Sequence, residues 1–147
     1  LTGTNGKSTT ARMLKHILRY TGCSVGLTST SGVYIDDVLV NPGDATGPRS
    51  ARMVLRDPTV EVAVLETARG GMLREGLAFD SCDIGAFLNV AEDHLGLKGI
   101  DTVEDLADLK ALVVETVKRS GTSVLNADDP LVRAKARRAG GHVAWFS

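Results

Sequence analysis

A glycine-rich segment near the start of the chain runs directly into a pattern of apolar residues with helical spacing. The segment reads Gly3-Thr4-Asn5-Gly6-Lys7-Ser8-Thr9-Thr10. Glycines, which have no Cβ, let backbone N–H groups approach a phosphate closely, and the N-terminus of a following helix adds a favourable dipole. The apolar positions that follow share one helical stripe and are Ala11, Leu14, Ile17 and Leu18. The segment therefore predicts a phosphate-binding loop in front of a helix, as found in folds that combine parallel strands with helices.

The residue types inside this loop predict a nucleotide bound with Mg²⁺. Lys7 can place a positive charge on the β- and γ-phosphates, and Ser8 can offer Mg²⁺ a hydroxyl oxygen. The nucleotide-binding residues expected here are Gly3, Thr4, Asn5, Gly6, Lys7, Ser8 and Thr9. The match to the common pattern G-x-x-x-x-G-K-[ST] is imperfect, because Leu1 stands where the first glycine would fall. The motif indicates a nucleotide but no particular reaction, and an ordinary glycine-rich turn before a helix stays open.

The rest of the chain alternates between strand and helix patterns. We expect helices at 9–20, 49–56, 102–121 and 130–139, strands at 25–28, 60–65, 84–90, 124–125 and 143–146, and a hairpin of 33–35 with 38–40. This order predicts an α/β fold with a mostly parallel sheet and flanking helices, like that of P-loop NTPases. Ligands of such sheets bind beyond the carboxyl ends of the strands, so the chemistry is expected in the loops that follow them.

Length and composition predict one globular domain over residues 1–147, with 43% hydrophobic and 24% charged residues. The chain opens on the phosphate loop without a strand to lead into it, so we expect a fragment truncated at both ends that works with other domains of the same chain. A net charge of −1 argues against nucleic acid or a membrane surface as partner. Cys23 and Cys82 lack the spacing of a disulfide framework or metal site, and we expect buried thiols in a cytoplasmic protein.

Two further loops carry polar groups at the ends of expected strands. Glu66 ends the strand 60–65, where a carboxylate facing the phosphate loop would contact Mg²⁺. The segment Asn89-Val90-Ala91-Glu92-Asp93-His94 follows the strand 84–90 in the same way, and His94 is a candidate metal ligand. A solvated acid and a structural histidine are the alternative interpretations of these two residues.

Taken together, these motifs resemble the central ATP-binding domain of the Mur ligase superfamily. The resemblance lies in Gly3–Ser8, Glu66, the loop Asn89 to Leu95, the segment Asn126-Ala127-Asp128-Asp129-Pro130, and the stretches 44–51 and 65–77. The last two stretches are similar to those members that build a polymer of aspartate and arginine. The resemblance implies an ATP-dependent ligase that phosphorylates a carboxylate, so that an amino-acid amine can attack the acyl phosphate. In those members the reaction adds arginine to aspartate side chains of the polymer.

The resemblance also implies roles for individual residues. Lys7, Glu66, His94 and Lys110 would be catalytic, and Asn89 would join the nucleotide site. The metal ligands implied for Mg²⁺ are Ser8, Thr30, Glu66, His94 and Lys110. Lys110 would act as a carbamate, and its apolar helical neighbours predict that it is partly buried.

The chemistry of arginine suggests a substrate role for Arg69 and Arg74, which flank a pair of glycines beside Glu66. Each guanidinium can bind a carboxylate of an acidic polymer or peptide bidentately, although surface arginines explain them equally well. Three alternatives to the whole assignment stay open: a P-loop ATPase or kinase, a nucleotide-binding module without catalysis, and another Mur-type ligase acting on poly-glutamate, folylpolyglutamate or a peptidoglycan precursor. The sequence is also compatible with a homo-oligomer.

Overall fold

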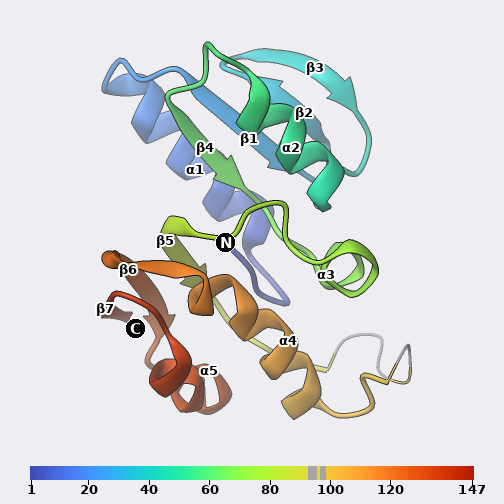
Figure 1. Ribbon diagram of the computed structural model, residues 1–147, viewed down its shortest axis with the longest axis vertical. Coiled ribbons are helices and arrows are strands. Elements are labelled where there is room, and N and C mark those ends of the chain that lie inside the picture. Colours follow the sequence, from blue (N-terminus) through green and yellow to red (C-terminus); the bar gives the residue numbers. More distant parts are fainter. Residues whose placement is uncertain (93–95, 97–98) are drawn as a thin grey trace. The chain divides into compact units, whose positions relative to one another are not determined.

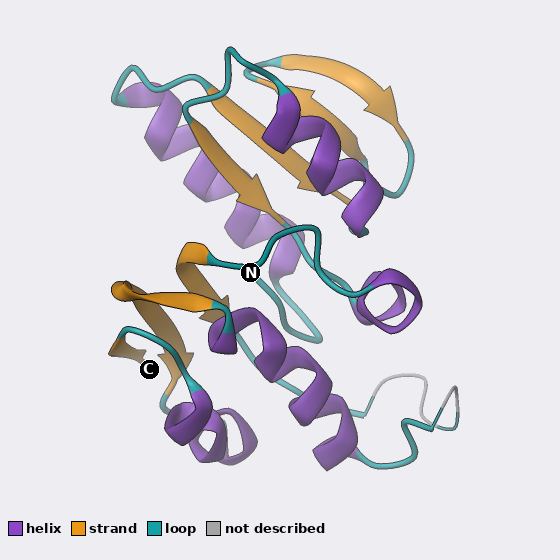
Figure 2. Ribbon diagram, in the orientation of Figure 1, coloured by secondary structure: helices purple, strands orange, loops and turns teal. Residues whose placement is uncertain are grey.

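The computed structural model describes residues 1–92, 96 and 99–147, and the chain divides into two compact units. One unit comprises residues 6–78, and the other comprises residues 1–5 together with 79–147. Each unit has its own sheet with helices packed against it (Figures 1 and 2). The expected α/β fold with parallel strands is confirmed, but the described strands form two sheets where one was expected. In the described part of the chain, no helix is long and apolar enough to cross a membrane.

The unit of residues 6–78 contains a four-stranded sheet in the order β3-β2-β1-β4. Its elements are α1 (Lys7–Tyr20), β1 (Val25–Ser29), β2 (Gly32–Ile35), β3 (Val38–Pro42), α2 (Pro48–Arg56), β4 (Val62–Leu65) and α3 (Arg69–Glu75). β1 runs parallel to β4, whereas β1, β2 and β3 form the predicted antiparallel hairpin and its extension. β3 forms the outer edge of this sheet, and all five of its residues are exposed.

Helices cover both faces of β1. Consecutive strand residues point to opposite sides of a sheet, so neighbouring residues of β1 face different helices. Leu27 borders a cavity lined by side chains of α1. Its neighbour Gly26 faces α2, since a Cβ built on Gly26 would lie 2.3 Å from Cγ1 of Val54. Val54 is fully buried and packs in a cluster with Val33 and Ala45. β1 is buried along its whole length and pairs in parallel register with β4, which sets the positions of the loops at their carboxyl ends.

The unit of residues 1–5 and 79–147 contains a three-stranded parallel sheet in the order β5-β6-β7. Its elements are β5 (Cys82–Phe87), α4 (Val103–Glu115), β6 (Val117–Asn126), α5 (Pro130–Ala134), a 3₁₀ helix (Lys135–Arg138) and β7 (His142–Phe146). Thr2 pairs with Phe87 in a parallel bridge, so the start of the chain extends alongside β5. The largest fully buried side chains described in this unit are Phe87, Leu106, Leu125, Val113, Val114 and Val132, together with Thr2.

Three expected element boundaries are wrong. The helix expected over 102–121 ends at Glu115, where the Thr116 hydroxyl donates to the carbonyl of Val113 at 3.0 Å. The strand expected at 124–125 is the ten-residue β6. The helix expected over 130–139 is a short α-helix followed by a 3₁₀ turn.

Two further findings differ from expectation. Residues 69–75 form α3, although no helix is expected there from the sequence, because its two adjacent glycines weaken a helical pattern. Cys23 and Cys82 are free thiols that are half-buried rather than buried. Burial raises the pKa of the Cys82 thiol, which keeps it protonated.

Candidate nucleotide and metal site

In residues 6–78, the structure brings together three of the residues expected around Mg²⁺. Ser8 lies in the first turn of α1, Thr30 follows β1, and Glu66 follows β4. Because β1 and β4 are parallel neighbours, their carboxyl ends meet at one edge of the sheet. The Ser8 hydroxyl donates to Oε2 of Glu66 at 2.8 Å and lies 3.2 Å from Oγ1 of Thr30. The expectation that Glu66 faces the phosphate loop is thus met in the geometry of this unit.

The second carboxylate oxygen of Glu66 is the feature that fits a metal. Glu66 is only 2% exposed, and its Oε1 is buried without a hydrogen-bond partner in the described residues. Burying a carboxylate oxygen without a partner costs free energy, which a cation would offset. The described residues contain no group of three His, Cys, Asp or Glu side chains able to hold a metal. One carboxylate and two hydroxyls instead suit Mg²⁺, which keeps waters and phosphate oxygens as its other ligands.

The loop turns into α1 at Gly6, which adopts a left-handed conformation with φ of 81°. This conformation is costly for residues with a Cβ and explains the glycine directly before Lys7. Lys7 begins the helix, Thr9 lies in its first turn, and no acidic residue occurs in that turn. The N-terminus of α1 therefore keeps its positive dipole end for an anion.

In the unit that contains residues 1–5, the side chain of Asn89 holds the first half of the phosphate loop. Its Oδ1 accepts from the backbone N–H of Thr4 at 3.0 Å and of Asn5 at 2.9 Å. Its Nδ2 donates to the carbonyl of Asn5 at 3.1 Å. A Cβ on Gly3 would lie 3.1 Å from Cβ of Leu88, so the glycine permits this close approach. All three of these hydrogen bonds join the Asn89 side chain to the backbone of the loop.

Lys110 reaches the same loop from α4. The side chain is 2% exposed, and Nζ donates to the carbonyl of Gly3 at 2.9 Å. Helix α4 is anchored by the predicted capping box: Thr102 Oγ1 accepts from the Asp105 N–H, and the Asp105 carboxylate accepts from the Thr102 N–H, both at 3.0 Å. The hydrogen bond from Thr102 also lowers the pKa of Asp105. Lys110 is therefore more deeply buried than the sequence predicts.

The segment 126–130 supports the loop after β5, a role that sequence reasoning did not assign. Asn126 Nδ2 donates to the carbonyl of Leu88 at 2.8 Å, and Oδ2 of Asp129 accepts from the Val90 N–H at 2.8 Å. The motif itself is visible in the sequence, but its partners lie 38 and 39 positions away. Nothing in the local pattern identifies them.

The stretches 44–51 and 65–77 pack against each other. The Ala68 N–H donates to the carbonyl of Thr46 at 3.2 Å, and a Cβ on Gly71 would lie 2.8 Å from Cα of Gly47. α3 therefore approaches the turn before α2 more closely than a side chain at Gly71 would allow. Arg69 begins α3, and the guanidinium of Arg74 lies over Gly70. His94 lies outside the described residues.

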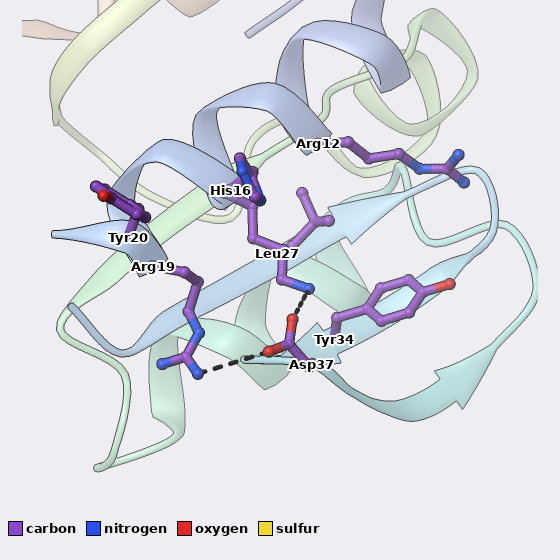
Figure 3. A pocket seen from close by; sticks show the side chains of 8 residues that line it. Arg12, His16, Arg19, Tyr20, Leu27, Tyr34 and Asp37 are labelled. Carbon is purple, nitrogen blue, oxygen red and sulfur yellow. Dashed lines mark hydrogen bonds and ion pairs between the residues drawn. The ribbon is translucent and has the colours of Figure 1, made fainter. Parts of the chain in front are cut away.

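A cavity of about 540 Å³ opens between α1 and β2 (Figure 3). It is lined by Arg12, Lys15, His16, Arg19, Tyr20, Leu27, Tyr34 and Asp37. Lys15 bonds to Asp37 at 2.9 Å and holds the pKa of that carboxyl below its usual value. Arg19 pairs with Asp36 at 3.1 Å. Two cations of the cavity, Lys15 and Arg19, are thus paired with carboxylates of the adjacent residues Asp36 and Asp37, which weakens the cavity as an anion site.

The chain is similar to known proteins at three levels: a protein family, curated proteins and solved structures. Residues 1–147 match the family described as the Mur ligase middle domain. The chain is 63% identical over 147 residues to a cyanophycin synthetase of Crocosphaera subtropica and 62% identical to one of Synechocystis sp.. The match covers the whole of this chain but only 17% of either relative.

The fold has a counterpart among solved structures. A UDP-N-acetylmuramoyl-L-alanyl-D-glutamate–2,6-diaminopimelate ligase matches 99% of this chain, and 31% of its own chain, with a TM-score of 0.76 and 24% identity. At this identity the likeness concerns the fold. The family match over the full length is the stronger result, and it shows that this chain belongs to the Mur ligase family as a middle domain.

Proposed function

We propose that this chain is the ATP- and Mg²⁺-binding part of a ligase that joins a carboxylate to the amine of an amino acid. The observation that carries the proposal is the Ser8–Glu66 pair, with a buried carboxylate oxygen left for a metal directly beside the start of the phosphate-loop helix. Phosphoryl transfer depends mainly on positioning and on charge neutralisation, so the protein needs no nucleophile of its own.

The reaction has two steps, and atoms balance in each. A substrate carboxylate oxygen attacks the γ-phosphorus of ATP, the bond to the β-phosphate oxygen breaks, and ADP leaves. The amine nitrogen then attacks the carbonyl carbon, the bond to the phosphate oxygen breaks, and the amine loses a proton. Bound Mg²⁺ would neutralise the phosphate charge, held by Ser8 and Glu66 with Thr30, His94 and a carbamate at Lys110 as further ligands. Lys7 would stabilise the charge on the γ-phosphate.

For the substrates, we propose that arginine is added to aspartate side chains of a polymer. Identity of 62–63% to cyanophycin synthetases over every residue of this chain supports this choice over a poly-glutamate, folylpolyglutamate or peptidoglycan ligase. Arg69 and Arg74 would steer polymer carboxylates, because α3 follows directly on Glu66. Adenine and acceptor contacts would come from other domains of the same chain. We therefore expect the isolated chain to bind Mg-ATP weakly and to form no amide.

The test uses the full-length enzyme with ATP, Mg²⁺, an aspartate–arginine polymer primer and arginine. We expect arginine incorporation with one ADP released per amide. Lys7→Ala should lower the rate by about a thousandfold or more with the fold intact. Lys118→Ala, which removes a surface lysine paired with Asp83, is the matched control and should react normally. Steady ADP release without an amine would indicate an ATPase instead. Incorporation of another amino acid in preference to arginine would show that arginine is not the amine substrate.

The proposed role of the two arginines has its own test. Arg69→Ala and Arg74→Ala should each raise KM for the polymer while leaving KM for ATP unchanged. Arg56→Ala, at the last position of α2, removes the same charge elsewhere in this unit and serves as a control. Unchanged KM for the polymer in both variants would refute the substrate role.

A further inference from the structure

We propose that Asp129 is a positioning residue of the nucleotide site, acting on the phosphate loop through the segment 89–91. The proposal rests on the proposed function as an ATP-using enzyme, because it concerns the geometry in which ATP is held. Asp129 stands directly before α5, forty residues after Asn89, and all the contacts that carry the argument lie within residues 1–5 and 79–147.

The two carboxylate oxygens of Asp129 bond in two different directions. Oδ1 accepts from the backbone N–H groups of Leu131 at 3.0 Å and Val132 at 3.1 Å, which caps the start of α5. Oδ2 accepts from the Val90 N–H at 2.8 Å. Only a carboxylate offers acceptors on both sides. An amide at this position would place its NH₂ donor where one of the two carboxylate oxygens now accepts from N–H, and a hydroxyl would have a single oxygen.

The bond to Val90 matters because both neighbours of Val90 hold the phosphate loop. Asn89 accepts from the N–H groups of Thr4 and Asn5. On the other side, the Ala91 N–H donates to Oγ1 of Thr4 at 3.1 Å. A shift of Val90 would therefore move both contacts at once. These contacts fix the loop backbone at Thr4 and Asn5, the two residues that precede Gly6 and the start of α1, where the N–H groups of a helix N-terminus suit a phosphate.

Capping alone does not explain an aspartate here. Helix α5 is only five residues long, and asparagine or serine would cap it about as well. The contribution specific to the carboxylate is the hydrogen bond from Oδ2 to the loop after β5. A second brace runs in parallel, because Asn126 Nδ2 donates to the carbonyl of Leu88 while Oδ1 of Asn126 accepts from the Asp128 N–H at 2.8 Å. The segment 126–129 thus holds residues 88–90 at two points.

The experiment replaces Asp129 with residues that keep the cap and lose the brace, in the full-length enzyme. Asp129→Asn and Asp129→Ser are the test variants, and Asp128→Asn removes the same charge one position earlier as the control. Three quantities are measured: the dissociation constant of a fluorescent ATP analogue, the kinetic constants for ATP, and the thermal unfolding midpoint. We expect both Asp129 variants to weaken analogue binding and to lower kcat/KM for ATP by roughly tenfold to a hundredfold. The control should match wild type, and the unfolding midpoints should stay within about 2 °C, since the cap remains.

A merely structural role gives a different pattern. Loss of folded protein lowers kcat and the unfolding midpoint together but leaves KM and the dissociation constant for the nucleotide unchanged. That pattern, or wild-type behaviour of both Asp129 variants, overturns the proposal. Analogue binding needs no ligation, so the positioning role can be measured even if the wild-type enzyme forms no amide. Absence of amide with intact nucleotide binding in wild type would refute the proposed reaction and not the role of Asp129.

Discussion

The Ser8 hydroxyl donates to one carboxylate oxygen of Glu66 at 2.8 Å, while the other oxygen of Glu66 is buried with no partner in the described residues. Without a cation, this arrangement leaves a negative charge desolvated and incompletely compensated. The proposed role of Glu66 as a metal ligand would therefore oppose the stability of the metal-free protein at this position.

Replacing Glu66 by glutamine should stabilise the metal-free protein and abolish its response to Mg²⁺. The amide keeps an acceptor for Ser8 and removes the buried charge, so we expect a gain of about 1 kcal/mol. Thermal unfolding in chelator, and again with Mg²⁺ and an ATP analogue, measures both effects. Glu61→Gln is the control, because Glu61 is exposed and accepts from the Ser24 N–H. A variant that still gains stability from Mg²⁺ like wild type would exclude Glu66 as a ligand.

Alanine at Gly71 should destabilise the protein, whereas alanine at the adjacent Gly70 should not. A Cβ on Gly71 meets backbone, with Cα of Gly47 at 2.8 Å, so α3 has to move at a cost of about 1–3 kcal/mol. A Cβ on Gly70 meets only the flexible end of Arg74 at 3.2 Å, and alanine gains helix propensity of up to about 1 kcal/mol. Urea unfolding of the two variants measures the difference. Equal stabilities would contradict the close contact between α3 and the turn at Gly47.

Lys110→Ala should be inactive, and short carboxylic acids should restore part of its turnover. The acid would replace the two oxygens of a carbamate at the metal, while the hydrogen bond from Lys110 Nζ to Gly3 would stay lost. We therefore expect kcat to recover and KM for ATP to stay high. The same acids should not restore Lys7→Ala. Full activity of the unrescued variant, or of wild-type enzyme in CO₂-free buffer, would exclude a metal role for Lys110.

Asp108 should make the protein more stable near neutral pH than in acid. The hydrogen bond from Lys135 lowers the pKa of Asp108, with Arg138 adding to the effect. A carboxyl whose pKa is lowered in the folded state stabilises above its unfolded value of about 3.9, and this contribution is lost as pH falls through the lower folded value. Asp108→Asn should cost less than about 1 kcal/mol at pH 7, because the pair is partly exposed, and the difference should shrink toward about pH 3. Denaturant unfolding over this pH range measures the difference in unfolding free energy between wild type and Asp108→Asn, with Asp101→Asn as a charge-matched control. A difference that stays constant with pH would contradict the lowered pKa of Asp108.

The elements that sequence reasoning located best are those whose patterns are local. The stripe from Ala11 to Leu18 and the hairpin around Asp36 and Asp37 match α1, β2 and β3. The sequence places the end of α4 too late because Val117 continues the apolar spacing of the helix, and no glycine or proline lies between Thr102 and Gly121. Valines at 113, 114 and 117 suit either a helix or a strand, and tertiary packing decides between them.

The site was predictable to the extent that its residues end strands or form the loop. Glu66 was located correctly beside Ser8 because parallel strands bring their carboxyl ends together. The contacts of Asn89 with the loop were not predictable, since they join residues 84 and 85 positions apart. The same holds for Asp129, whose partner Val90 is identified only by the folded chain.

The exposed edge strand β3 has a consequence for how this chain behaves in solution. Val38, Leu39 and Val40 are 64%, 46% and 48% exposed and form an uninterrupted aliphatic run without a charge to discourage pairing. Strand edges of this kind associate with one another through backbone hydrogen bonds. Pro42, which has no N–H to donate, interrupts this pairing only at the last residue of β3. Concentrated samples should therefore self-associate through this edge, and a lysine in place of Val40 should keep them dispersed.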